Sequence, residues 1–389
     1  MSVLGSTVGR VFAGLLAMLA VATAVGLVLL WPEGDPALDL GPGLGNKTQR
    51  AEVLRIVESP CSGFDETCRG VAVRVETGPD RGRITAFQLG VGGIDPPLEV
   101  GDVLRVAPEE PLPGARQRSY TLADFERRAP MLWLAIAFAA LVVVFGRLRG
   151  ALSLVGLAVS LVVVVVFVLP GILTGEPPLA VATVGALAIM LVTILLTHGT
   201  GPKAIAAALG TAASLLLTIA LAVAFTGLTN LTGLATEEAT LLAANSSGVS
   251  LEGLLLAGIV IAALGVLDDV TVSQASTVLA LRAANPAQSF ATLFRRALEV
   301  GRDHVSATVN TLVLAYVGAS LPALLLLSST QLRLGETLNS EVVAKEIVAT
   351  LVGSIGLIAA VPITTALAVL LSGRLEPEAL AAAEHGHSH

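Results

Sequence analysis

Long apolar runs without a charged side chain constrain this chain more than any other feature. Most of them are long enough to cross the ~30 Å hydrocarbon core of a bilayer as a helix. The composition agrees, because 54% of the residues are hydrophobic and only 14% are charged, whereas soluble domains are roughly one quarter charged. The sequence therefore predicts an α-helical multi-pass membrane protein with about eight transmembrane helices. We place them at Val11–Trp31, Met131–Gly146, Ala151–Leu169, Leu179–Thr197, Ala204–Thr226, Leu251–Arg282, Val305–Leu327 and Ile347–Leu371.

Basic residues in the short loops predict the orientation of these helices. Loops on the cytoplasmic side carry an excess of Lys and Arg. With the N-terminus inside, nine basic residues fall on the inner side and only Arg333 and Lys345 on the outer side. The inner set is Arg10, Arg147, Arg149, Lys203, Arg282, Arg295, Arg296, Arg302 and Arg374. Both termini are therefore expected in the cytoplasm. The first run is expected to be an uncleaved anchor, with a cleaved signal peptide as the alternative.

The long segment between the first two spans is expected to lie outside the cytoplasm. A linker rich in Gly, Pro and Asp, Pro32–Asn46, comes first. Val71, Val73 and Val75 then alternate with more polar residues, which is the period of a half-buried strand. Four further segments are similar: Ala51–Val57, Arg83–Leu89, Leu98–Val106 and Arg118–Leu122. Five short strands predict a small all-β domain of OB-like size, inserted after helix one.

The only two cysteines, Cys61 and Cys68, both belong to this β-domain. An oxidising compartment favours a disulfide between them. The alternative is a metal or redox pair, but no His lies nearby to complete a zinc site. We therefore predict a structural disulfide that closes a short loop.

The sixth span contains the most informative polar residues. Asp268 and Asp269 follow an apolar stretch, and Gln274 comes shortly after them. If the helix continues to Arg282, Asp268 lies near the bilayer centre, where a carboxylate must face protein, ions or water. On that helix Asp269, Ser273 and Thr277 share one face. The alternative is that the span ends at Leu267, which would place both carboxylates in cytoplasmic water.

A second polar group opens the seventh span. Asn285-Pro286 interrupts the chain, and the residues from Gln288 to Gly301 have the spacing of an amphipathic helix on the inner leaflet. The sequence then reads Arg302, Asp303 and His304, with Asn310 two turns further on. One interpretation is that these residues cap the helix and bond it to its neighbours. The other is that Asp268, Asp269, Asp303 and His304 line one cavity that binds a cation or relays protons.

Two long blocks carry a resemblance to a known family. The blocks Gly265–Val278 and Gly301–Pro322 resemble the YibE/F family of bacterial membrane proteins. The similarity extends over most of the chain from about Arg50. It implies a multi-pass protein of the bacterial inner membrane, and it implies no particular activity.

These observations together predict a secondary transporter of an ion or small solute. Its site would contain Asp268, Asp269, Gln274, Arg302, Asp303, His304 and Asn310. The alternative is a non-transporting envelope protein whose β-domain binds a partner. An intramembrane aspartyl protease is less favoured, because residues 265–268 read Gly-Val-Leu-Asp instead of Gly-x-Gly-Asp.

The expected organisation is an anchor (residues 1–31), a β-domain with its linker (32–129), a seven-helix membrane core (130–374) and a cytoplasmic tail (375–389). We expect no cofactor. Partners would be the bilayer, the solute and either a second copy or an envelope protein bound through the β-domain. The net charge of −7 argues against nucleic acid. Spans three to five and six to eight would form two triplets of opposite orientation, as in many transporters.

Overall fold

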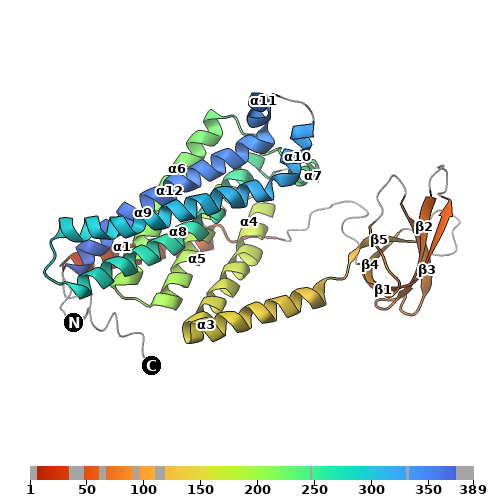
Figure 1. The fold of residues 1–389 in the computed structure, drawn as a ribbon, viewed down its shortest axis with the longest axis horizontal. Helices are drawn as coiled ribbons and strands as arrows, with labels where there is room; N and C mark the ends of the chain where they lie inside the picture. The colour runs from red at the N-terminus through yellow and green to blue at the C-terminus, as the bar shows by residue number, and fades with distance from the viewer. Residues whose placement is uncertain are drawn as a thin grey trace. The chain divides into compact units, whose positions relative to one another are not determined.

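The computed structural model describes residues 7–34, 48–60, 67–90, 96–109, 119–245, 248–329 and 333–373. The chain divides into two compact units (Figure 1). One unit, here called the helical unit, consists of Met1–Leu38 and Val143–His389. The other, the β-unit, is Asp39–Val142.

The β-unit is built on one antiparallel sheet in the order β3-β2-β1-β4-β5. The strands are β1 (Gln49–Pro60), β2 (Thr67–Val75), β3 (Ile84–Leu89), β4 (Val103–Pro108) and β5 (Tyr120–Phe125). The sheet curls, since β3 at one end also contacts β5 at the other. Val71, Val73 and Val75 are fully buried against Val53 and Leu104, which confirms the alternation predicted for β2.

The strand predicted at Leu98–Val106 begins later than expected, at Val103. A turn comes first, in which Gly101 adopts φ 98°, a conformation that glycine reaches without steric cost. The Asp102 carboxylate accepts a hydrogen bond from the backbone N–H of Glu99 (2.8 Å) and holds this turn. Leu98 still packs in the core of the β-unit. The prediction that this segment contributes apolar residues to the core is therefore confirmed, whereas the prediction that it is already a strand at Leu98 is wrong.

The structure describes only one of the two cysteines in the predicted disulfide. Cys68 is fully buried in β2, and the register of β1 on β2 places it opposite Ser59. Cys61 lies outside the described residues, as does the tail after Gly373. The bond between Cys61 and Cys68 therefore stays a prediction.

The helices account for most of the rest of the described chain. Their bounds are α1 (Thr7–Leu29), α3 (Arg128–Val163), a π-helical turn η3 (Val164–Val168), α4 (Leu169–Leu173), α5 (Pro178–His198), α6 (Pro202–Leu228), α7 (Glu237–Asn245), α8 (Leu251–Ala284), α9 (Phe290–Ala319), α10 (Leu321–Ser329), α11 (Leu334–Asn339) and α12 (Glu341–Ser372). Within the described residues six helices are long and apolar enough to cross a membrane, and α9 with α10, bent by 60°, adds a seventh. This pattern is typical of a membrane protein.

Two of the eight predicted spans, Met131–Gly146 and Ala151–Leu169, fall in the helical segment Arg128–Leu173. This segment has 46 residues, enough for two spans of about 20 residues each. Arg147 breaks the segment with φ 51° and ψ −133°. This break falls between the two predicted spans and accounts for the difference in number.

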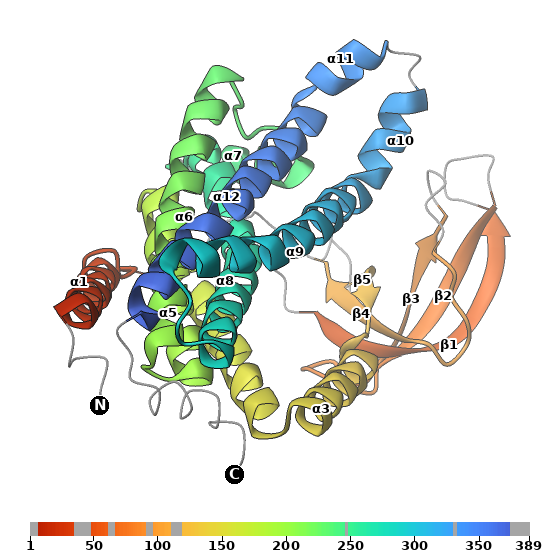
Figure 2. The ribbon, with the colours of Figure 1, turned by 60° about the vertical axis from the view of Figure 1, so that its left-hand side comes forward.

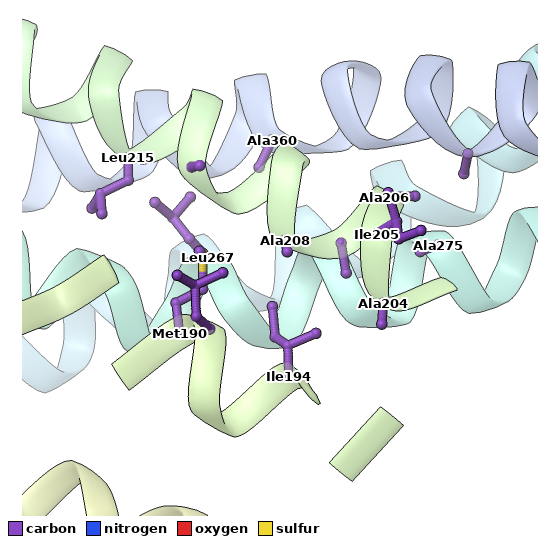
Figure 3. Close-up of a cluster of buried hydrophobic side chains, with 14 of the residues drawn as sticks. Met190, Ile194, Ala204, Ile205, Ala206, Ala208, Leu215, Leu267, Ala275 and Ala360 are labelled. Carbon is purple, nitrogen blue, oxygen red and sulfur yellow. The ribbon is translucent and has the colours of Figure 1, made fainter. Parts of the chain in front are cut away.

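The core of the helical unit lies where α6, α8 and α12 contact one another, with α5 against α8. Figure 3 shows several alanines in this core, among them Ala208 of α6 and Ala360 of α12, which lie above Leu267 of α8 in the view. Small residues let helix backbones approach closely, which favours association where lipid removes the hydrophobic driving force. This close crossing of three helices determines where the buried polar side chains described below can lie.

The amphipathic helix predicted at Gln288–Gly301 and the span predicted from Val305 form a single helix, α9. It runs along α12 in Figures 1 and 2. The segment contains no proline, so nothing forces a break between the two parts. Gly301 is buried in the middle, where a Cβ atom would meet Val361 and, at 2.8 Å, Gln274 Oε1. The glycine therefore serves close packing here and does not end the helix.

Candidate functional site

The polar residues of α8 separate into an inner and an outer face. Thr271 and Gln274 are buried, and Asp268, one turn earlier, is half-buried. Asp269 and Ser273 are exposed. The helix continues through Asp268 to Ala284, so Leu267 does not end it, and the alternative that the membrane span ends at Leu267 stays a prediction. The inner face is therefore Asp268, Thr271 and Gln274, here called the polar stripe of α8.

Hydrogen bonds connect the polar stripe to the three helices around it. The hydroxyl groups of Thr271 and Thr211 of α6 lie 2.6 Å apart. Gln274 Nε2 donates to Thr365 Oγ1 of α12 (2.7 Å) and to the carbonyl oxygen of Ala297 of α9 (2.8 Å). The stripe is thus the place where α6, α8, α9 and α12 meet through polar groups inside an otherwise apolar core.

Two oxygen atoms in this part of the core have no hydrogen-bond partner within the described residues. One is Oδ1 of Asp268 and the other is Oγ1 of Thr364, which is fully buried on α12. Buried polar atoms in folded proteins are nearly always paired, so each exception needs an explanation. A carboxylate oxygen that is shielded from solvent and unpaired is a candidate ligand for a cation, a proton or a water molecule.

Close packing holds α6 and α12 together beside the stripe. Gly210 of α6 lies against Thr364 of α12, and Gly356 of α12 lies against Thr218 of α6; neither glycine has room for a Cβ atom. The two contacts are reciprocal, because each helix supplies one glycine and one threonine eight residues apart. Such an arrangement requires the two helices to run antiparallel and brings their backbones into close approach.

The predicted residues of α9 lie on its outside. Arg302, Asp303, His304 and Asn310 are all exposed. His304 is close enough to Asp269 for its charge to act on that carboxylate. These four side chains therefore lie on the exposed side of α9, whereas Gln274 is buried. One cavity shared by all the predicted residues stays a prediction.

The sequence suggested Arg282 only as a positive charge on the cytoplasmic side, but its side chain holds the end of α8 in place through hydrogen bonds. Its side chain is buried, and Nη1 donates to the carbonyl oxygens of Gln288 (2.7 Å) and Pro286 (3.2 Å). Nε lies 3.4 Å from Ser372 Oγ at the end of α12. The guanidinium thus ties the loop before α9 to α8 and α12, and it fixes the end of the helix that carries the polar stripe.

Sequence reasoning did not identify Thr211, Thr271, Thr364 or Thr365. A threonine in a helix commonly donates to its own backbone, as Thr365 does to the carbonyl oxygen of Val361 (2.6 Å). Such a residue gives no periodic signal that distinguishes it from the others in the same helix. Only the packing of α6 and α12 on α8 shows that Thr271 belongs to the stripe and that Thr211 and Thr365 are its partners.

Comparison with known proteins identifies the helical part of the chain. The model of the family described as YibE/F-like protein matches residues 134–374, more than half of the chain. The match contains the polar stripe, its threonine partners and the exposed residues of α9, and it begins after the β-sheet. No curated protein and no solved structure matches this chain.

Proposed function

We propose that this chain, which belongs to the YibE/F-like family, is a secondary transporter that carries an ion or small solute across the bacterial inner membrane. The observation that carries the proposal is the polar stripe of α8, with its unpaired Asp268 oxygen, inside the crossing of α6, α8 and α12. In this proposal the helical unit spans the membrane, and the stripe lies on the path of the solute.

The cost of an acidic residue at this depth supports the proposal. An aspartate at the centre of a membrane helix costs about 2.5–3.5 kcal/mol on insertion scales, so such residues face protein partners, ions or water. Asp268 lies in the middle of α8, with long apolar segments before it. Protein groups among the described residues leave its Oδ1 unpaired. A bound cation, a proton or water would provide the missing interaction.

The relation between α6 and α12 gives a second line of support. They end the two helix triplets of opposite orientation expected from the sequence. Helices related by a two-fold axis in the membrane plane cross antiparallel and exchange equivalent contacts. The reciprocal pairs Gly210–Thr364 and Thr218–Gly356 have this property. Transporters with such repeats bind their substrates near the crossing, at mid-membrane.

The residues of the stripe have chemically distinct roles in this proposal. The Asp268 carboxylate binds the cation or proton that couples transport. The hydroxyl of Thr271 and the amide of Gln274 supply neutral oxygen atoms one and two turns further along. The chain shows no ATP-binding motif of the P-loop type, so in this proposal the energy comes from an ion gradient or from a partner protein.

Reconstituted proteoliposomes test the proposal. The protein is inserted into vesicles with an internal pH-sensitive dye, and proton or sodium flux is measured after a pH or sodium gradient is imposed. Asp268→Asn should abolish the flux and leave reconstitution unchanged. Glu252→Gln, which removes an exposed carboxylate from the start of the same helix, is the matched control and should leave the flux unchanged. Flux that persists in Asp268→Asn would refute the role of the stripe.

The β-unit supports the second candidate, an envelope protein that binds a partner. Its strand order, together with the β3–β5 contact, is that of a curled five-stranded sheet, and we infer an OB-like barrel from it. A groove of about 420 Å³ lies on this unit and is lined by Arg50, Arg74, Arg81 and Glu76, among others. Arg50 is paired with Glu76 (2.8 Å) and Arg74 with Glu52 (3.5 Å), so the Arg81 guanidinium is the group that we propose for an acidic ligand. If Arg81→Glu changes the set of proteins that purify with the full chain and no variant changes any flux, this candidate is favoured.

A further inference from the structure

The outer face of α9 has the residue spacing of a helix-pairing seam. Asp303, Ala307, Asn310, Leu314 and Val317 are separated alternately by four and three residues, the repeat that places side chains along one line of a helix–helix contact. All five are exposed, with Leu314 and Val317 60% and 45% exposed. We call this line the outer seam of α9.

The seam lies opposite the side by which α9 packs in its own chain, except at Val317, which also lines a groove that Leu324 of α10 and Leu351 of α12 border. Gly301, Val305, Leu312 and Tyr316 are buried or half-buried against α8 and α12. In a membrane-spanning α9 the outer seam would therefore turn the Asn310 amide toward lipid, with the Asp303 carboxylate at the edge of the span. Hydrocarbon offers an amide no hydrogen bond, so polar residues in spans almost always face other protein or a water-filled cavity. Something is expected to cover them.

The charges near the seam indicate what covers it. Arg302 and His304 flank Asp303 directly, so positive and negative groups lie side by side at one depth. Two copies inserted in the same orientation bring their α9 helices together in parallel, and their seams meet at equal depth about a two-fold axis. Asp303 of each copy then meets its own equivalent, and Arg302 of both copies lies beside this pair of carboxylates and offsets their charge. Asn310 meets its own equivalent, and two amides satisfy one another.

We propose that this protein forms a homodimer through the outer seam of α9. The Asn310 pair fixes the register, as a single buried polar residue does in a helix-pairing seam, and Leu314 and Val317 pack beyond it. The inference rests on the membrane placement of the helical unit given under Proposed function, but it requires no transport activity. It places the contact between copies on α9 and not on the β-domain.

Site-specific photo-crosslinking in native membranes tests the dimer. A benzophenone amino acid replaces Leu314 in chains that carry two different tags and are expressed together. The matched control is the same probe at Leu216, an apolar α6 residue of similar exposure (58% against 60%). After irradiation, Leu314 should give a product that contains both tags, and Leu216 should give lipid adducts without that product. Asn310→Leu should weaken self-association about five- to thirty-fold, since interhelical hydrogen bonds of this type are worth ~1–2 kcal/mol.

Four results would overturn the dimer. Equal two-tag products from both positions would mean non-specific collision. Adducts of Leu314 only with lipid, with residues 128–142 of its own chain or with another protein would assign the seam a different neighbour. If Asn310→Leu associates as strongly as the unaltered protein, Asn310 does not form the proposed amide pair. If neither probe reacts with lipid or with a second copy, the membrane placement fails, whereas a dimer without flux would leave this inference intact and refute only transport.

Discussion

Replacement of Gln274 by Leu measures how much the hydrogen bonds of this residue contribute to the free energy of unfolding. The side chains are similar in volume, so the change removes two hydrogen bonds with little change in packing: those to Thr365 Oγ1 and to the carbonyl oxygen of Ala297. Thr365 keeps its bond to the carbonyl oxygen of Val361 and is not left unpaired. The expected cost is therefore the net value of two interhelical hydrogen bonds and no more.

The magnitude follows from measurements on membrane helices, where such bonds average ~0.6 kcal/mol and reach ~1.7 kcal/mol. Gln274→Leu should then destabilise the helical unit by about 1–3 kcal/mol. A double-mutant cycle with Thr365→Val separates one bond from the other. Its coupling free energy should be near 0.6 kcal/mol, because the Thr365–Val361 bond is lost equally in both backgrounds.

Reversible unfolding in mixed micelles, followed by the loss of helical signal, measures these free energies. Gln274→Leu without any destabilisation, together with a coupling energy of zero, would refute the reasoning, since the two bonds would then contribute nothing. A loss well above 3 kcal/mol would also contradict it, because it would require Gln274 to support more than its two partners.

Three other predictions test packing, redox state and orientation. Gly356→Leu should destabilise the protein by about 1–3 kcal/mol, because the new side chain overlaps Thr218, whereas Gly265→Leu, with open space around the glycine, should change the unfolding free energy little. Alkylation of the unreduced protein should label neither Cys61 nor Cys68 by intact mass, and two labels would contradict the disulfide. Reporter fusions should show activity outside the cytoplasm within the β-domain and inside at the C-terminus, and a cytoplasmic signal from the β-domain would reverse the orientation.

The sequence predicted the mostly helical fold with a separate β-domain, and it identified α8 as the helix with the most informative polar residues. Uncharged apolar runs determine which segments form long helices, because each run satisfies its backbone hydrogen bonds internally. Period-two valines identified β2 in the same way. The break at Arg147 was placed correctly between two spans, but its geometry was not, since a single residue of unusual backbone conformation replaces a loop.

The inner face of α8 could not be predicted for a physical reason. Polar residues occur on two sides of this helix, Asp269 and Ser273 on one and Asp268, Thr271 and Gln274 on the other. Periodicity identifies both sides equally. The choice between them depends on where α6 and α12 pack, and these helices are distant in the sequence. A helix with polar residues on two sides has no single side that its sequence marks as buried. Tertiary contacts therefore decide which side is buried.

The central claim is that water and a solute reach the polar stripe inside the crossing of α6, α8 and α12. Cysteine accessibility in proteoliposomes tests this claim directly, with Thr271→Cys compared with Leu267→Cys. Both positions are fully buried on α8, but Leu267 packs in the apolar cluster and Thr271 faces Thr211. A charged, membrane-impermeant thiol reagent should modify Thr271→Cys and leave Leu267→Cys and the unaltered protein unmodified. Equal protection of both cysteines, with an imposed ion gradient and without one, would contradict the account.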